Sequence, residues 1–251
     1  MNKDLISKRF AKAVDTYEEE AVVQKYIAAE MTRLVQEYIS HSCNRILEVG
    51  CGTGLFSRML LNSFHPDSMI LNDLCPAVKH SLTPLLSDKV SFLPGDAEQV
   101  IFAGEQDLIV SCSAVQWFVS LEDFFERCSS LLTPEGYLAF STFGQRNMNE
   151  VSALTGEQLP YRSLSELEQM LETNYELIYS RQEQQILKFA SPIEVLRHLK
   201  RTGVTATQHT FVWTKARLAD FCQQYIEQFS DESGAVSLTY HPIYIIVKQK
   251  Q

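Results

Sequence analysis

A carboxylate and three glycines at alternate positions occur together in the sequence Glu48-Val49-Gly50-Cys51-Gly52-Thr53-Gly54. This spacing lets the backbone turn tightly and lets a ligand lie against bare peptide, because glycine has no Cβ. The third glycine comes one residue too early for the G-x-G-x-x-G of dinucleotide-binding enzymes, and no Gly-Lys-Ser/Thr ending indicates a nucleoside triphosphate loop. The motif therefore predicts a loop that holds a nucleotide-like ligand of another kind.

Two further carboxylates follow apolar segments of the chain. Asp73 ends the run Met69–Asp73, and Asp96 follows the run 90–95. In an open α/β sheet a carboxylate at the end of the second strand typically binds ribose hydroxyls. Together with Glu48, these three acidic strand ends suit a ligand that carries positive charge and lacks phosphate.

The segments around these residues alternate between strand and helix patterns. Such alternation predicts an α/β fold with a parallel, doubly wound sheet of Rossmann-like type. The predicted strands are Arg45–Val49, Met69–Asp73, Val90–Leu93, Asp107–Cys112 and Gly136–Phe143, and the predicted helices lie near 53–63, 76–86 and 120–132.

The rest of the chain predicts a cover for this sheet. Residues 1–40 have helical spacing, and further helices are expected after Ser163, over 193–201 and over 215–229. Residues 175–190 and 236–248 alternate like long strands. We expect one domain over 1–251, with a core of about 40–145 plus 174–190 and 235–250. A helical lid is expected from 1–35, 145–173 and 191–230.

Composition excludes several classes of protein. The chain has 251 residues, a net charge of −9 and 45% hydrophobic residues, enough for a substantial core but unfavourable for a nucleic-acid partner. No stretch approaches the roughly 20 apolar residues of a membrane span, and no signal peptide opens the chain. The six cysteines show no metal-binding spacing, so we expect no metal, reduced thiols and a cytoplasmic protein.

Charge is unevenly distributed along the chain. Residues 181–217 carry a net charge of +5, whereas the remainder carries −14. A local basic face on an acidic protein favours docking of a small acidic partner, although a solvated helix face has the same pattern.

The glycine loop with its three acidic strand ends resembles class I S-adenosylmethionine-dependent methyltransferases. The resemblance implies that Glu48 lies near the methionine amino group, that Asp73 binds the ribose and that Asp96 contacts the adenine edge. The cofactor-binding set that it implies is Glu48, Gly50, Gly52, Gly54, Asp73, Leu74, Asp96, Ala97 and Ser113. A similar loop that binds another ligand, or none, is the alternative.

The substrate is expected beyond the ends of the fourth and fifth strands, where ligands of open sheets bind. Gln116 and Trp117 follow the fourth strand, and Phe143 ends the fifth. Alternatively, Gln116 caps the turn that follows, and Trp117 packs between helix and sheet.

More specific segments are similar to the malonyl-acyl carrier protein O-methyltransferases of biotin synthesis, and they span nearly the whole chain in order. Phe118 and Val204 depart from the family, which often has Cys and Ala there. The segments are 9–18, Ala114-Val115-Gln116-Trp117, 140–144, 198–204 and Leu238-Thr239-Tyr240-His241-Pro242.

The resemblance implies methyl transfer from S-adenosylmethionine to the free malonyl carboxylate, which is already ionised at neutral pH and needs no general base. Uncharged donors suit this step, and we expect Tyr17 and Gln116 to hold the carboxylate. Tyr17 is otherwise a core aromatic residue. Lys200 and Arg201 are expected to contact the acyl carrier protein or its phosphopantetheine, with the enzyme acting as a monomer. The alternatives are a methyltransferase of another small carboxylic acid or metabolite, and a binding module without activity.

Overall fold

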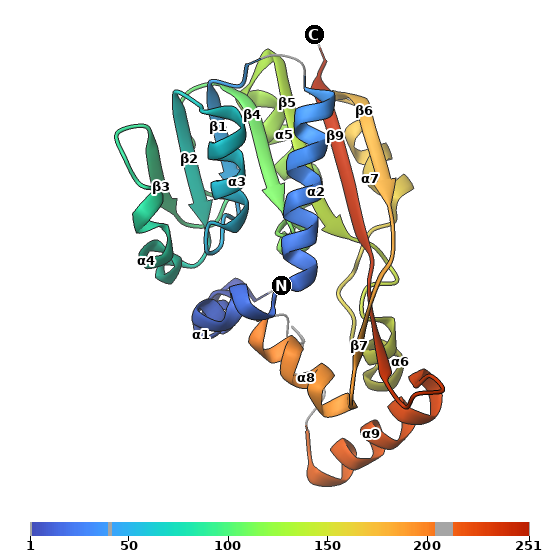
Figure 1. Ribbon diagram of the computed structural model, residues 1–251. Coiled ribbons are helices and arrows are strands. Elements are labelled where there is room, and N and C mark those ends of the chain that lie inside the picture. The colour runs from blue at the N-terminus through green and yellow to red at the C-terminus, as the bar shows by residue number, and fades with distance from the viewer. Residues whose placement is uncertain (1, 40–41, 204–212, 251) are drawn as a thin grey trace.

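The computed structural model describes residues 2–39, 42–203 and 213–250 and contains a seven-stranded sheet (Figure 1). The strand order is β3-β2-β1-β4-β5-β9-β6, with the first five strands parallel and β9 antiparallel to both of its neighbours. The strands are β1 (Arg45–Val49), β2 (Ser68–Asp73), β3 (Val90–Pro94), β4 (Gln106–Cys112), β5 (Leu132–Phe143), β6 (Tyr175–Gln182) and β9 (Pro242–Gln249). The parallel α/β sheet predicted from the sequence is confirmed.

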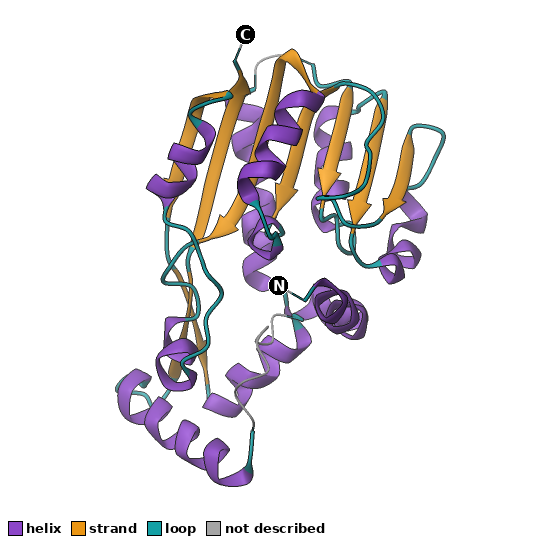
Figure 2. Ribbon diagram, turned by 180° about the vertical axis from the view of Figure 1, so that it is seen from behind, coloured by secondary structure: helices purple, strands orange, loops and turns teal. Residues whose placement is uncertain are grey.

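Helices cover both faces of this sheet (Figure 2). On one face, α2 (Val22–Tyr38) and α3 (Leu55–Phe64) pack on each other and on the central strands. On the other, α5 (Leu121–Leu131) and α7 (Leu164–Leu171) enclose a second apolar cluster. The predicted helix over 76–86 consists of three short pieces, η1 (Pro76–Val78), α4 (Lys79–Leu82) and η2 (Thr83–Leu85).

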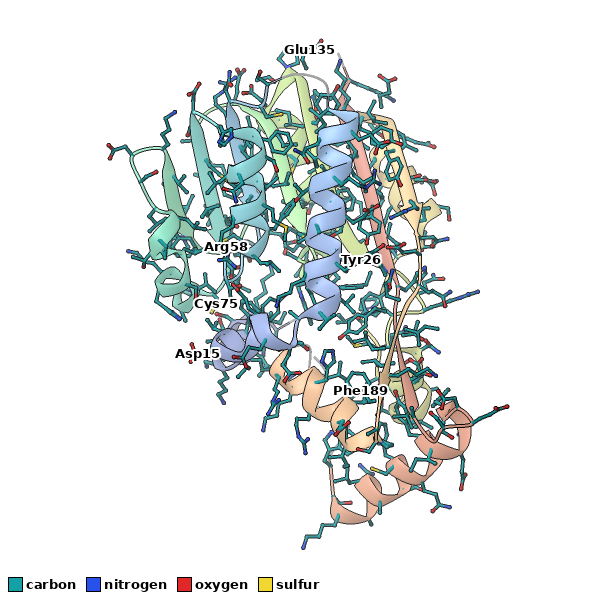
Figure 3. All side chains as sticks on the ribbon, in the orientation of Figure 1. Asp15, Tyr26, Arg58, Cys75, Glu135 and Phe189 are labelled. Atoms are coloured by element: carbon teal, nitrogen blue, oxygen red, sulfur yellow. The ribbon has the colours of Figure 1, made fainter. Side chains whose placement is uncertain are left out.

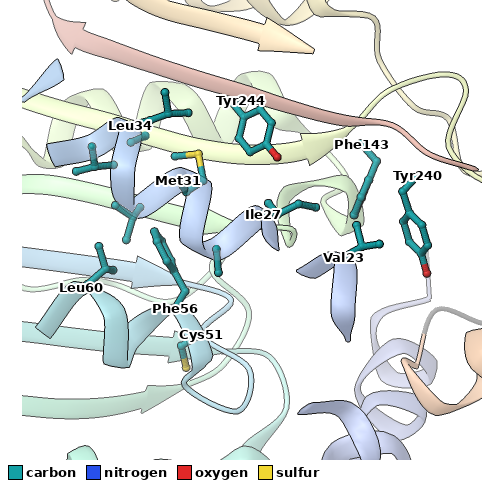
Figure 4. Packing of buried hydrophobic residues seen from close by; sticks show 14 of the residues in the cluster. Val23, Ile27, Met31, Leu34, Cys51, Phe56, Leu60, Phe143, Tyr240 and Tyr244 are labelled. Atoms are coloured by element: carbon teal, nitrogen blue, oxygen red, sulfur yellow. The ribbon is translucent and has the colours of Figure 1, made fainter. Parts of the chain in front are cut away.

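Helix α2 packs on one face of the sheet and is not part of a lid, although the sequence suggested a lid over 1–35. On its apolar face, Ile27 and Met31 are fully buried and lie between Phe56 of α3 and Tyr244 of β9 (Figure 4). Helix α7, within the predicted lid segment 145–173, likewise packs on β6 and α5. Both helices carry an apolar stripe wide enough to cover a sheet.

The remaining elements lie beyond the carboxyl ends of the parallel strands, toward which the strand arrows point (Figure 1). They form a cap that contains a separate two-stranded ribbon. The cap consists of α1 (Lys3–Glu20), η3 (Val115–Trp117), α6 (Asn149–Thr155), α8 (Pro192–Arg201), α9 (Lys215–Phe229), and the ribbon strands β7 (Gln185–Phe189) and β8 (Val236–Tyr240). Val204, in the segment compared with the family, lies outside the described residues.

Each of the two long strands predicted over 175–190 and 236–248 is in fact a pair of strands in different sheets. In the second segment the break between β8 and β9 falls at His241, whose backbone groups bond to a loop instead of a neighbouring strand. Its carbonyl accepts from Gly144 N at 2.8 Å, and its N–H donates to Asn147 Oδ1 at 3.3 Å. Alternation of side chains continues through the break, so periodicity alone does not reveal it.

The two ends of the parallel strands have different surroundings. Figure 3 places Arg58 and Cys75 near the carboxyl ends of the strands, close to α1, and Glu135 at the other end of the sheet. Within the described ranges, no helix combines the length and apolar character needed to cross a membrane.

Candidate active site

A cavity opens at the carboxyl edge of the sheet, between the ends of β1, β2 and β4, helix α1 and the residues that directly follow α8. Most of the site residues predicted from the sequence line it: Tyr17, Glu48, Gly50, Gly52, Asp73, Leu74, Asp96, Ala97, Ser113, Gln116, Trp117 and Phe143. Three predicted residues, Gly54, Lys200 and Arg201, do not line it. The fold thus brings together residues that are up to 126 positions apart, from Tyr17 to Phe143.

The glycine loop leaves a bare backbone wall in this cavity. Gly50 has a φ of +76°, and a Cβ there would lie 2.3 Å from the Cβ of Ala114. Gly52 has a φ of +54°, and a Cβ there would lie 3.4 Å from the ring of Phe10. Gly54 instead precedes α3 as its N-cap, and a Cβ there would lie only 2.8 Å from Leu82 and 2.9 Å from Leu85. Gly50 and Gly52 therefore shape the cavity, whereas Gly54 serves the packing of α3.

Two buried carboxyl groups give the cavity its acidic end. Glu48 is 1% exposed, and its Oε2 atom has no hydrogen-bond partner among the described residues. Burial raises the pKa of Glu48 to about 8, and the nearby Asp73 adds to the rise. Burial also raises the pKa of Asp73 to about 6, against the lowering effect of backbone N–H donors. A cationic ligand group beside Glu48 would satisfy both its charge and its empty acceptor.

Asp96 is engaged by the cap. Both of its carboxylate oxygens lie 2.6 Å from Lys3 Nζ of α1, and Lys3 also pairs with Glu98. Among the described residues that line the cavity, Lys3 is the only cationic side chain. The ion pair fastens the start of α1 to the end of β3, so a ligand contact by Asp96 would have to share this carboxylate with Lys3.

Gln116 both caps its turn, as the alternative interpretation predicted, and lines the cavity. Its Nε2 donates to the Ser113 carbonyl at 2.6 Å, and its Oε1 accepts from Thr142 Oγ1 at 3.4 Å. Ser113 itself has a φ of +57°, a conformation that L-residues rarely adopt and that recurs at functional sites. One N–H of the Gln116 amide is thus used within the turn, and the other is left for a ligand.

Aromatic side chains form a further part of the cavity lining. Tyr17 packs edge-on against Phe10, with ring centroids 5.2 Å apart, and is partly buried. Burial, with the nearby Cys112 and Asp73, raises the pKa of Tyr17 above its ordinary value. Phe143 lies 6.0 Å from Tyr240 between ring centroids (Figure 4). The Tyr17 hydroxyl therefore stays protonated and able to donate at any working pH.

Several lining residues were not among the predicted site residues. Gln24 is 5% exposed, and its Oε1 has no partner among the described residues. A glutamine on the buried face of α2, beside Val23 and Ile27, was the signal that could have identified it. Tyr161 lies between α6 and α7, in a segment without periodicity, so its position in the cavity depends on tertiary packing alone.

The basic segment 181–217 is partly neutralised inside the fold. Arg181 pairs with Glu30 at 2.7 Å, and Lys188 pairs with Asp231 at 2.9 Å. Arg201 bonds to Glu20 of α1, which makes it a tie between α8 and α1. Arg197 and Lys200 remain exposed on the outward face of α8.

Comparison with known proteins agrees with this geometry. A family model described as a methyltransferase domain matches residues 47–140. The malonyl-[acyl-carrier protein] O-methyltransferase of Bacteroides thetaiotaomicron is 49% identical over 100% of both chains.

Solved structures share the fold at low sequence identity. The YcgJ protein of Bacillus subtilis has a TM-score of 0.65 and 15% identity, covering 89% of this chain and 99% of that one. The N-methyltransferase NodS of Bradyrhizobium japonicum, solved with S-adenosyl-L-homocysteine, has a TM-score of 0.53 and 14% identity, covering 89% and 87%.

Proposed function

This chain belongs to the family of malonyl-[acyl-carrier protein] O-methyltransferases, and from that premise we propose that it methylates the free carboxylate of a malonyl group on an acyl carrier protein. The methyl donor is S-adenosylmethionine, and the product is a malonyl methyl ester that enters biotin (pimeloyl) synthesis. The observation that carries the proposal is one cavity lined both by two buried carboxyl groups beside the glycine loop, Glu48 and Asp73, and by the neutral donors Tyr17 and Gln116. We also propose that the enzyme acts as a monomer.

The cavity fits the proposed donor at its acidic end. Bound S-adenosylmethionine would supply an electrophilic methyl group on a positively charged sulfur. The empty Oε2 of Glu48 suits the amino group of its methionine part, and Asp73 at the end of β2 suits its ribose. The bare wall at Gly50 and Gly52 lets such a ligand lie against the backbone.

The substrate end suits a carboxylate that must remain nucleophilic. The hydroxyl of Tyr17 and the remaining N–H of Gln116 would orient the carboxylate without neutralising it, whereas an arginine or lysine would hold its electrons more tightly. The one cationic side chain of the described lining, Lys3, is already paired with Asp96 and Glu98. These residues therefore align the attacking oxygen and exclude water, and no group has to remove a proton.

We propose that the acidic carrier protein docks on the outward face of α8. Arg197 and Lys200 are exposed there, while Arg201 is bonded to Glu20. Opposite charge on the two surfaces would guide their encounter. Buried thiols such as Cys51, Cys75 and Cys128 suit a reducing compartment, so we also propose a cytoplasmic location.

The experiment incubates the pure protein with S-adenosylmethionine and malonyl-acyl carrier protein, and separately with malonyl-coenzyme A. Mass spectrometry then measures how fast each acyl group gains one methyl group. We expect methylation of both thioesters, faster on the carrier protein. No methylation of either thioester, in a protein that binds S-adenosylhomocysteine, would overturn the proposed substrate and leave the cofactor assignment in place.

A further inference from the structure

Tyr161, in the segment that joins α6 to α7, lines the same cavity. Its hydroxyl oxygen lies 2.8 Å from Asn147 Nδ2. Asn147 is 1% exposed, and its other amide atom, Oδ1, lies 3.3 Å from the backbone nitrogen of His241. These three groups form a chain of hydrogen bonds from the break between β8 and β9 to the cavity.

The direction of these hydrogen bonds follows from the backbone N–H of His241. A backbone N–H can only donate, so His241 fixes Oδ1 of Asn147 as the acceptor. The Nδ2 group of Asn147 therefore faces Tyr161, and because an amide NH₂ can only donate, the Tyr161 oxygen accepts. The hydroxyl hydrogen of Tyr161 is left to point toward an acceptor in the cavity.

A neighbouring tyrosine shows the contrast. Tyr240 also lines the cavity, but its hydroxyl lies 2.8 Å from His198 Nε2 and is fully buried among protein groups. Tyr161 has no such second partner among the described residues. Burial also raises the pKa of Tyr161 to about 12, in spite of the opposing effect of Asn147, so its proton is retained across the working pH range.

Resting on the proposed function, we infer that Tyr161 is a substrate-binding residue that donates its hydroxyl hydrogen to the malonyl carboxylate, with Asn147 as the residue that aims this hydrogen. The chemistry recognised is an anionic acyl terminus at the end of a thioester. Tyr161 would thus distinguish malonyl from acyl groups without a carboxylate. A donor on this carboxylate binds the ground state, since the negative charge is lost as the ester forms.

The experiment measures, by calorimetry in the presence of S-adenosylhomocysteine, the affinity of the protein for malonyl- and acetyl-acyl carrier protein. The Tyr161→Phe variant should bind the malonyl form roughly 10-fold or more weaker, as expected for a lost hydrogen bond to a charged group, with the acetyl form unchanged. In turnover assays the variant should raise KM more than it lowers kcat. Tyr179→Phe, at a tyrosine of β6 that stacks on Tyr38, is the matched control.

A second variant tests the direction of the hydrogen bonds. Asn147→Asp replaces the amide donor with an acceptor, so the Tyr161 hydroxyl would turn from the cavity to donate to it. This variant should reproduce the malonyl-selective loss while still binding S-adenosylhomocysteine, and combining it with Tyr161→Phe should add little.

Three outcomes are distinct. Equal losses for the malonyl and acetyl forms would reduce Tyr161 to a packing residue, and no loss would show that other groups bind the carboxylate; either result overturns the inference. A wild-type protein that methylates no malonyl thioester would overturn the proposed function itself.

Discussion

The backbone N–H of Gly52 donates a 2.8 Å hydrogen bond to Oδ2 of Asp73, joining the glycine loop to the end of the neighbouring strand. The other carboxylate oxygen of Asp73 accepts from the N–H of Cys75 at 2.7 Å. One carboxylate thus holds two backbone segments in place while facing the cavity. The loop conformation and the proposed ribose contact therefore depend on the same side chain.

Replacing Asp73 by asparagine should weaken cofactor binding. The amide keeps one acceptor, but its NH₂ group would oppose one of the two backbone donors. We expect affinity for S-adenosylhomocysteine to fall by roughly 10- to 100-fold, as for loss of a hydrogen bond to a charged group. Calorimetry on Asp73→Asn measures this, with the exposed Asp67→Asn as control. Unchanged affinity would remove Asp73 from the cofactor site.

Cofactor binding should strengthen as pH rises. The pKa of Glu48 is raised to about 8 and that of Asp73 to about 6, so at pH 6 Glu48 is mostly protonated and cannot attract a cationic group. A ligand that binds the ionised forms must displace these protons, so its affinity should increase between pH 6 and 8 and level off above about pH 9. Titrations with S-adenosylhomocysteine across this range measure the effect.

The Glu48→Gln variant separates the two carboxyl groups in this titration. It should bind more weakly and lose most of the pH dependence above pH 6.5. The free energy of unfolding of the ligand-free wild-type protein should instead fall as pH rises from 4.5, the ordinary pKa of Glu48, toward about 8, its raised pKa in the folded protein. Over this range the unfolded chain ionises Glu48 freely, whereas the folded protein must keep it protonated or pay to ionise it. Wild-type affinity that does not vary from pH 6 to 8 would contradict the assignment of Glu48.

Local signals explain which parts of this site were predictable. The glycines of the loop and the carboxylates at 48, 73 and 96 stand at strand ends, where sequence pattern fixes their position in the sheet. Arg201 was predicted from the family resemblance and the basic charge of its segment, and its bond to Glu20 depends on how α1 packs on α8. The position of Tyr161 depends on its hydrogen bond to Asn147, which is held in turn by the backbone of His241 at the strand break. Neither contact produces a periodic pattern in the sequence.

Tyr17→Phe tests the role of the α1 hydroxyl. The ring contact with Phe10 is kept, so the packing of α1 over the cavity should be unchanged. We expect catalytic efficiency on malonyl-acyl carrier protein to fall by about 10-fold or more, while affinity for S-adenosylhomocysteine stays constant. Steady-state kinetics and calorimetry measure the two quantities. Equal losses in both would mean that Tyr17 only packs over the cofactor.

Reversing the charge of Lys200 tests the docking face of α8. Lys200 is exposed, whereas a change at Arg201 would also disturb its bond to Glu20. Lys200→Glu should raise KM for the carrier-bound substrate by about 3- to 10-fold at low salt, and the difference should shrink as salt screens the charges. Lys89→Glu, at an exposed lysine directly before β3 that pairs with Asp67 outside the cap, is the control. A KM that is insensitive to both substitution and salt would place docking elsewhere.

The most direct test of the central claim locates the transferred methyl group. The protein is incubated with methyl-labelled S-adenosylmethionine and malonyl-acyl carrier protein, and the labelled product is treated with alkali. Because a methyl ester is hydrolysed and a carbon-bound methyl is not, we predict that the acyl group gains one label and that alkali releases it as methanol. Label that stays on the acyl group after this treatment, or that never reaches it, would contradict methylation of the malonyl carboxylate.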